Sequence, residues 1–224
     1  MKIIEIRPRR KFLSGIVFDC EIDPKEFGAD TDAAGFLSLD SELCEIKHLK
    51  AGMQLTDAEL LELVRESHIK RAKSRAMWYL SRGDLAKKTL FDKLRRSFPE
   101  YACTIACDRA EELGYINDEA YAKRRLQRII DEKRVSVRMA KQLLRQEGID
   151  PDLVDDAAEE VEYDPVEAIA GLIERKYKNK IGEKEQRDKV IAALMRKGYG
   201  FSEIKEALSR FNPDNEYYCE ENDD

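Results

Sequence analysis

The sequence predicts a mainly α-helical protein, with three tandem three-helix repeats in an elongated array behind a small N-terminal β-containing domain. Charged residues make up 38% of the 224 residues, whereas average domains contain roughly 25%. Gly and Pro, which interrupt helices, number only 11 and 6. Similar apolar residues also recur 50 positions apart. Because one such unit buries little apolar surface alone, we expect neighbouring units to stack.

Residues 1–68 predict a small β-rich domain that ends in a helix. Short β-branched or aromatic runs at 2–6, 13–18 and 35–39 favour an antiparallel sheet. An acidic, turn-rich segment, 23–34, separates the last two runs. Thr56 and Glu59 have the spacing of a capping box, which predicts a helix start at this point.

The remaining sequence predicts helical repeats at 69–117, 118–163 and 164–212, followed by a flexible acidic tail at 213–224. Candidate helix starts are Asp84, Asp150 and Asp164, and candidate ends are Gly114, Gly148 and Gly198. The alternative is one irregular bundle with chance spacing, which the agreement of starts, ends and apolar positions disfavours. Leu94, Leu144 and Leu194 are expected in equivalent buried positions. Three further sets mark the repeat, as residues spaced by 50, residues near the turn and residues of the helix after the turn: Leu90, Ala140 and Val190; Phe98, Ile149 and Tyr199; Ile105, Val154 and Ile204.

No motif in the sequence indicates catalysis, so we expect no enzyme, no catalytic residue and no cofactor. Neither a P-loop nor a Gly-x-Gly-x-x-Gly fingerprint occurs. We also expect no metal site, because His48 and His68 lack partners at ligand spacing, and Cys103 and Cys107 are better explained as packing residues. Five scattered cysteines and the absence of a long apolar run favour a reduced, monomeric, cytoplasmic protein without membrane contact.

The charge is distributed unevenly. Residues 1–69 carry a net −5, residues 70–150 a net +8 and residues 151–224 a net −9. A basic centre in an acidic protein indicates an anionic partner, either phosphate or an acidic protein surface. The alternative is a solvated helix face whose cations pair with Asp131, Glu132 and Glu147. The candidate binding residues are Lys123, Arg124, Arg125, Arg128, Lys133, Arg134, Arg138, Lys141 and Arg145.

The basic centre also contains a candidate stripe of cations and four aromatic residues that could contact an anionic partner or its bases. Arg134, Arg138, Lys141 and Arg145 form one stripe if a helix begins at Arg134. Four aromatic residues can stack on bases, although their apolar register favours the core: Trp78, Tyr79, Tyr115 and Tyr121.

Residues 113–122, with the sequence Leu-Gly-Tyr-Ile-Asn-Asp-Glu-Ala-Tyr-Ala, are similar to a junction motif of the RecX family. The segments 145–149 and 196–199 resemble the ends of that family's repeat units, and the resemblance covers about residues 69–212. Residues 23–36 and 214–224 depart from the family pattern. The resemblance implies a non-enzymatic regulator of the RecA recombinase in DNA repair, recombination and the SOS response.

Such a regulator would lie in the groove of the RecA–DNA filament, contact several protomers and dampen ATP hydrolysis and LexA cleavage. It would bind bare DNA only weakly. The alternative is a direct DNA-binding, helix-turn-helix-like protein. The acidic total and the lack of a basic stripe in every repeat disfavour that alternative.

Overall fold

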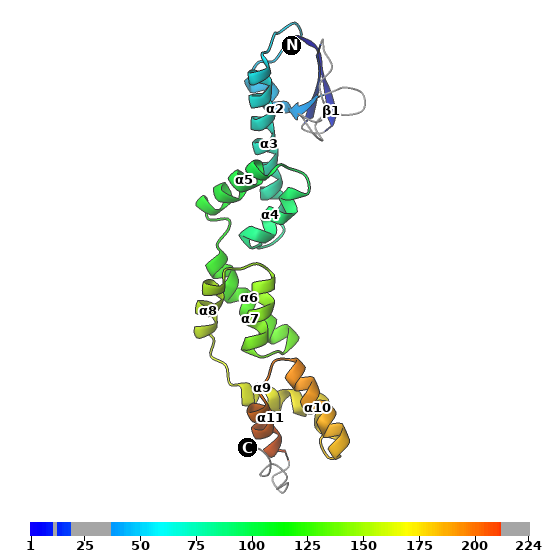
Figure 1. Ribbon diagram of the computed structural model, residues 1–224, viewed down its shortest axis with the longest axis vertical. Coiled ribbons are helices and arrows are strands. Elements are labelled where there is room, and N and C mark those ends of the chain that lie inside the picture. The colour runs from blue at the N-terminus through cyan, green and yellow to red at the C-terminus, as the bar shows by residue number, and fades with distance from the viewer. Residues whose placement is uncertain (11–12, 19–36, 212–224) are drawn as a thin grey trace. The chain divides into compact units, whose positions relative to one another are not determined.

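A computed structural model describes residues 1–10, 13–18 and 37–211 (Figure 1). The predicted acidic segments 23–34 and 213–224 lie outside these residues. The chain divides into two compact units, Met1–Ile116 and a second that begins at Asn117. The first holds a three-stranded antiparallel sheet and one set of helices, and the second holds two further sets. The predicted fold class, helical repeats with a small N-terminal sheet, is confirmed.

The sheet pairs β1 (Ile3–Arg10) with β2 (Leu13–Phe18), and β2 with β3 (Leu37–Asp40). Strand residues Ile3, Ile16 and Leu37 are fully buried and form its core. Helix α2 (Ser41–Ile46) follows β3 directly. The side chain of Asp40 caps α2 by accepting a 3.0 Å hydrogen bond from the backbone N–H of Leu43.

Helix α3 (Asp57–Leu80) runs without interruption from the sheet into the first repeat, so the boundary expected after residue 68 falls inside it. The predicted capping box is confirmed, since the N–H of Thr56 donates to Glu59 Oε2 at 2.8 Å. Ser67 fixes α3 to the sheet, because its Oγ accepts a 2.9 Å hydrogen bond from the N–H of Asp40.

The first repeat combines the second half of α3 with α4 (Lys87–Arg95) and α5 (Glu100–Glu112). Its core contains mostly small residues from α3 and α5, which lets these helices approach closely: Ala72, Ala76, Ala102, Cys103, Ala106, Cys107 and Ala110. The predicted start at Asp84 is wrong, because Ala86 holds the N-cap position of α4. The predicted end at Gly114 is confirmed by its positive φ of 74°.

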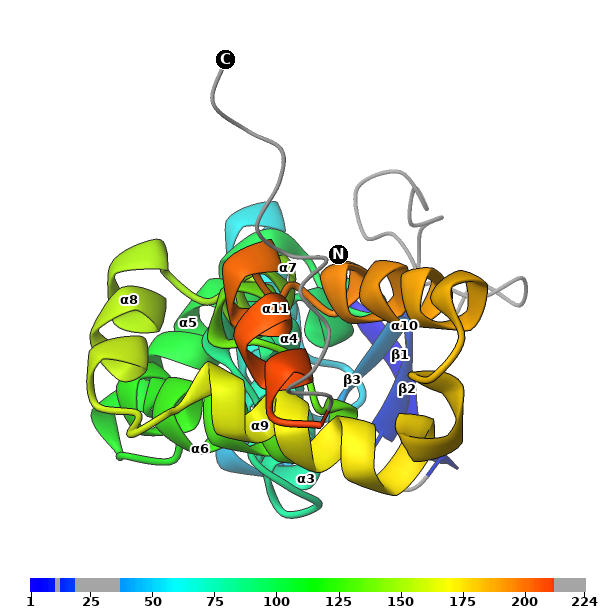
Figure 2. The same ribbon diagram turned by 90° about the horizontal axis from the view of Figure 1, so that it is seen from below.

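The second repeat contains α6 (Asp118–Lys133), α7 (Val137–Gln146) and α8 (Pro151–Glu159). The third contains α9 (Pro165–Leu172), a π-helical turn (Ile173–Tyr177), a 3-10 turn (Lys178–Lys180), α10 (Lys184–Arg196) and α11 (Phe201–Ser209). Helices α9 and α11 pack side by side (Figure 2). Asp150 and Asp164 cap α8 and α9 as predicted, each followed by Pro at the first helical position.

The 50-residue spacing reflects equivalent positions in α4, α7 and α10. Leu94, Leu144 and Leu194 are all fully buried there. Ile105, Val154 and Ile204 each lie in the helix that follows the turn, as expected, although Ile105 takes a different position in its helix from the other two. Val154 and Ile204 lie four residues after the N-caps of α8 and α11, and the residue four after the N-cap of α5 is Cys103. Cys103 is fully buried, whereas Ile105 is half-buried.

A joint of mainly backbone contacts connects the second and third repeats. The N–H of Ser136 donates to the carbonyl of Lys197 at 3.0 Å. In return, Lys197 Nζ donates to the carbonyls of Lys133 and Arg134 at 2.6 and 3.2 Å. Gly198, with φ at 89°, lies directly against Ser136 and Met139. The third repeat therefore supplies a cation to the last carbonyls of α6, where the helix dipole favours positive charge.

Candidate partner-binding surface

The nine candidate cations belong to two helices and the turn between them. Lys123, Arg124, Arg125, Arg128 and Lys133 lie on α6, and Arg138, Lys141 and Arg145 lie on α7. Arg134 lies between the helices in a left-handed conformation, with φ at 50°. The structure therefore brings all nine into the second repeat.

The predicted four-residue stripe is wrong at Arg134. Helix α7 begins three residues later, because Ser136 is its N-cap and accepts a hydrogen bond from the N–H of Met139 at 3.2 Å. Val135 and Ser136 are buried, so the turn cannot continue as an exposed helical face. The remaining members, Arg138, Lys141 and Arg145, do share one face of α7 and line a shallow surface hollow there.

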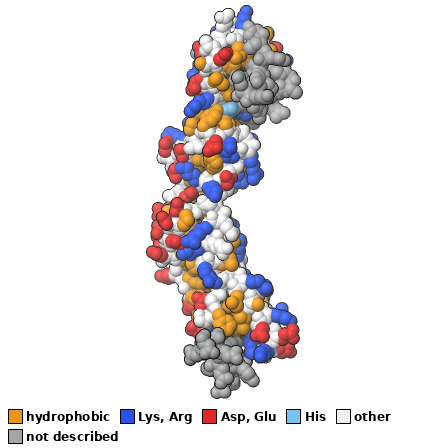
Figure 3. Space-filling view, in the orientation of Figure 1, with side chains coloured by type: hydrophobic (Ala, Val, Ile, Leu, Met, Phe, Trp, Pro, Cys, Tyr) orange, Lys and Arg blue, Asp and Glu red, His pale blue; other side chains and the backbone are white. Residues whose placement is uncertain are grey.

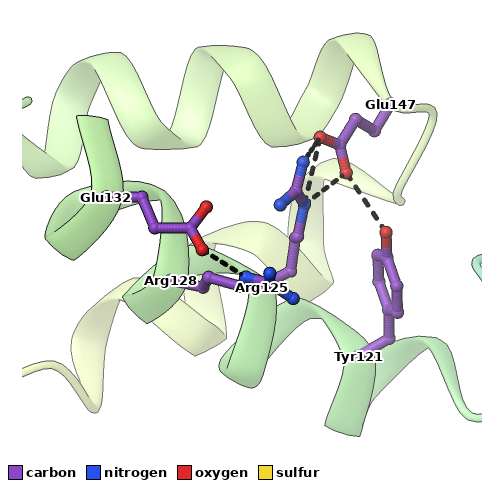
Figure 4. A network of polar contacts seen from close by, with 5 residues as sticks. All are labelled: Tyr121, Arg125, Arg128, Glu132 and Glu147. Atoms are coloured by element: carbon purple, nitrogen blue, oxygen red, sulfur yellow. Dashed lines mark hydrogen bonds and ion pairs between the residues drawn. The ribbon is translucent and has the colours of Figure 1, made fainter. Parts of the chain in front are cut away.

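Arg125 ties α6 to the end of α7 (Figure 4). Its guanidinium donates to both carboxylate oxygens of Glu147, with distances from 2.6 to 3.1 Å. The hydroxyl of Tyr121 donates to the same carboxylate at 3.3 Å. Burial, followed by the charge of Glu147, raises the pKa of Tyr121, so its hydroxyl keeps its proton at neutral pH. Arg125 thus stabilises the repeat rather than presenting a free charge.

Four more of the predicted cations are neutralised within the repeat. Lys123 pairs with Glu119 at 3.1 Å and with Glu160 at 2.7 Å. Arg128 pairs with Glu132 at 2.7 Å (Figure 4). Lys141 and Arg145 both bind Asp155 of α8, at 2.6 and 2.7 Å.

Asp155 is the shared partner of two α7 cations, and both favour its charged form. The hydrogen bond from Lys141, together with the charge of Arg145, lowers the pKa of Asp155. Acidic side chains gather over α8, with Lys and Arg side chains beside them (Figure 3). A carboxylate of this helix therefore pairs with two of the cations that the sequence predicts as binding residues.

Three candidate cations have no ion pair among the described residues: Lys133, Arg134 and Arg138. All three are exposed, and so is Arg124. Guanidinium groups at such positions bind phosphate or carboxylate through paired hydrogen bonds. We call Lys133, Arg134 and Arg138, with Lys141 and Arg145, the basic surface of the second repeat. The arrangement suits an extended anionic partner and has no feature of a small-molecule pocket.

The core position expected for the aromatic residues is wrong for two of them. Trp78 and Tyr115 are 43% and 55% exposed, whereas Tyr79 and Tyr121 are half-buried. Trp78 lies on the face of α3 opposite Ala72 and Ala76, which fill the core instead.

The sequence reasoning also missed the cations around Trp78. Residues 67–83 contain five Lys and Arg residues and no Asp or Glu. A run of one charge sign on a predicted helix is the signal that could have identified this segment.

The described residues contain no group of three or more potential metal ligands. His48 is exposed, and His68 Nδ1 lies 2.6 Å from the hydroxyl of Tyr101. Cys44, Cys103 and Cys107 are free and buried, while Cys20 and Cys219 lie outside the described residues. Burial raises the pKa of Cys107 to about 11, which makes it unreactive. None of the helices in the described part of the chain is long and apolar enough to cross a membrane.

Repeated three-helix units with an exposed basic surface define a helical-repeat protein, a class that binds partners across extended surfaces. Residues 162–208 match the family model for the third three-helix domain of RecX. Two proteins named Regulatory protein RecX align with the chain. That of Staphylococcus carnosus is 28% identical, with 86% of this chain and 74% of the relative covered. That of Streptococcus gordonii is 25% identical, with 73% and 64% covered.

Solved structures support the same fold. A crystal structure of regulatory protein RecX covers 96% of this chain and 99% of its own, with 22% identity and a TM-score of 0.59. RecX from Lactobacillus salivarius covers 65% of this chain and 97% of its own, with 22% identity and a TM-score of 0.57. The chain is thus similar to the RecX family in its family-model match, its relatives and its fold. It spans slightly less than two thirds of the length of the Streptococcus gordonii relative.

Proposed function

We propose that the chain is a non-enzymatic regulator that binds the RecA–DNA filament and inhibits recombination, ATP hydrolysis and coprotease activity. The proposal rests on the match of its repeats to relatives named Regulatory protein RecX. The basic surface of the second repeat supplies a complementary contact for an anionic partner. Successive repeats would place several weak contacts along a filament, and their combined affinity exceeds that of any single contact. The protein would act in the cytoplasm, as a monomer, during DNA repair and the SOS response.

The direct test is DNA-dependent ATP hydrolysis by the recombinase of the same organism. Adding the chain should lower the hydrolysis rate in a concentration-dependent way. Binding to bare duplex DNA and to recombinase-coated DNA should be compared across a salt series. A direct DNA-binding protein would hold bare DNA tightly with a steep salt dependence, and that result would favour the helix-turn-helix-like alternative.

The basic surface can be tested by the double substitution Arg134→Glu and Arg138→Glu. Exposed charges usually change stability by less than about 0.5 kcal/mol, so the melting temperature should hardly move. Inhibition should weaken strongly, because two like charges would then face the anionic partner. The matched control is Lys88→Glu with Arg96→Glu, an exposed cation of α4 and one at its C-cap, whose reversal changes the net charge equally. If both double variants lose inhibition to the same extent, only the total charge matters.

A further inference from the structure

The second half of α3 and the turn after it form a segment with basic side chains and no acidic ones. Between Glu66 and Asp84 the sequence holds five cations and no carboxylate. Arg71, Arg75, Trp78 and Arg82 follow one another at intervals of four, three and four residues. This spacing aligns Arg71, Arg75 and Trp78 on one side of α3, over a length of about 10 Å. Arg82 lies in the turn after the helix, with its guanidinium over the Trp78 ring. We call these four residues the α3 strip.

Trp78 lies within the strip as an exposed ring in contact with two guanidinium groups. Arg82 Cζ lies 3.5 Å from the ring centroid and Arg75 Cζ lies 5.2 Å from it. Neither arginine forms an ion pair with a carboxylate among the described residues. Since 43% of Trp78 remains exposed, the ring has free area for a further flat group.

The hollow beside the strip has both aromatic and cationic walls. Its volume is about 540 Å³, and Arg71, Arg75, Trp78 and Phe98 contribute to its lining. The guanidinium of Arg71 lies 5.6 Å from the centre of the Phe98 ring. Two carboxylates, Asp40 and Glu42, also line the hollow, and both are bound by Lys70, at 3.4 and 2.8 Å.

We propose that the α3 strip is a binding site for single-stranded DNA, in which a base stacks on Trp78 while arginines of the strip bind the flanking phosphates. A guanidinium held at stacking distance shows that the ring accepts a flat, delocalised group on its face. A base has the same shape, and an arginine displaced from the ring gains a phosphate oxygen as a partner. Aromatic rings between cations are the arrangement by which proteins hold single strands without reading their sequence.

Two features favour a single strand over the other anionic partners. A duplex keeps its bases stacked inside, so it offers phosphates but no free base for Trp78. An acidic peptide would use the arginines but would gain little from an exposed tryptophan ring. This site belongs to the first repeat, whereas the basic surface proposed for the filament belongs to the second, and its test requires no recombinase.

Trp78 is the only tryptophan in the chain, so its fluorescence reports directly on the site. The full chain should be titrated at low salt with a twelve-nucleotide oligodeoxythymidylate. The same titration should be made with an abasic strand of equal length and with a duplex of equal length. The oligodeoxythymidylate should quench the tryptophan emission as it binds. The abasic strand and the duplex should cause little quenching, because neither presents an unstacked base.

Variants separate stacking from charge. Trp78→Ala should weaken oligodeoxythymidylate binding, measured by anisotropy of a labelled strand, by about tenfold. Trp78→Phe keeps an aromatic ring and should retain most of the affinity. Replacing Arg75 and Arg82 together by Ala should reduce the slope of log affinity against log salt by about 1.4, as two lost phosphate contacts require. Lys88→Ala removes an exposed cation from α4, outside the strip, and should leave quenching and affinity unchanged.

Circular dichroism should show unchanged helicity in each variant, because the substituted side chains are exposed. The proposal is overturned if the labelled strand saturates the protein without quenching Trp78, or if Trp78→Ala binds as tightly as the unaltered chain. It is also overturned if poly-glutamate quenches the emission and the oligodeoxythymidylate does not, since the site would then fit an acidic protein.

Discussion

Gly198 is the residue whose replacement the joint between the second and third repeats tolerates least. Its φ of 89° lies in the left-handed region, where a side chain costs roughly 1–2 kcal/mol. An added Cβ would also meet Ser136 Oγ and would lie 2.8 Å from the Cβ of Met139. Both groups belong to the start of α7, which is packed and cannot move aside freely.

Gly198→Ala should lower the free energy of unfolding by about 2–4 kcal/mol, the sum of backbone strain and overpacking. The control is Gly114→Ala, where φ is 74° and nothing lies within 4 Å of the added Cβ. That variant carries the strain alone and should lose only about 1 kcal/mol. Thermal or urea unfolding of both variants measures the difference. Equal losses would contradict the close contact between the repeats.

Asp155 has a matched neighbour that allows its role to be isolated. Asp155 binds Lys141 and Arg145, whereas the adjacent Asp156 is exposed and has no ion pair among the described residues. Asp155→Asn should therefore release two cations of the basic surface and raise the affinity for the anionic partner. Asp156→Asn changes the net charge equally and should have a smaller effect. The salt needed to elute each variant from heparin measures the change, and identical elution would show that Asp155 does not shield the surface.

The same ion pair predicts a direction for pH dependence. The lowered pKa of Asp155 means that its contribution to stability is complete above the ordinary carboxyl pKa of 3.8. That contribution is lost as the pH falls below 3.8 and passes through the lower pKa that Asp155 has in the folded protein. Asp155→Asn should therefore lower stability slightly in the neutral range, where the contribution is complete, and weaken the dependence of stability on pH below 3.8. Denaturation midpoints measured from pH 2 to pH 7 provide the check.

At the scale of helices and strands, the sequence predicts a helix start correctly where a capping side chain accepts a hydrogen bond from a nearby backbone N–H. Asp150, Asp164 and Thr56 cap helices as their spacing predicts, because each hydrogen bond joins residues two or three positions apart. Asp84 failed because nothing local distinguishes a capping Asp from one in the preceding loop. Tertiary packing of buried Ala86 and Leu90 fixes the start of α4 instead.

The continuity of α3 was not predictable from apolar periodicity. Its first half buries Leu60 and Val64 in the sheet core, and its second half buries Ala72 and Ala76 in the repeat core. Leu60 and Ala72 are 12 residues apart, which rotates the buried face by about 120° around the helix axis. A helix with two differently oriented faces has no single apolar stripe, so the sequence pattern suggested two separate helices.

The location of the basic surface was predictable from the sequence, but which of its cations form ion pairs was not. The sequence located a basic region, and all nine residues lie in the second repeat. Which of them are free depends on carboxylates contributed by other helices, such as Glu147 and Asp155. Such pairs depend on three-dimensional packing, and the sequence alone left both the paired and the unpaired alternatives open.

For the whole molecule, the division at residue 116 predicts two independently stable parts. The first unit has its own sheet core and helical core, and the third repeat has a separate buried core in the second unit. Fragments 1–116 and 117–224 should therefore each be helical and unfold cooperatively in circular dichroism. A fragment that starts at residue 69 should be less stable than 1–116, because it cuts α3 in half. Failure of 1–116 to fold would show that the first unit depends on the second.

The joint at Gly198 has a consequence for how the charge of the basic surface can change. Arg134 contributes only its carbonyl to the joint, and that carbonyl remains whichever side chain the position carries. The side chain itself belongs to the basic surface. Mutation can therefore retune the charge presented to a partner without disturbing the attachment of the neighbouring repeat. The backbone carbonyl that attaches the neighbouring repeat and the side chain that sets the surface charge are therefore separate groups of one residue, so the charge of the surface can change while the attachment is kept.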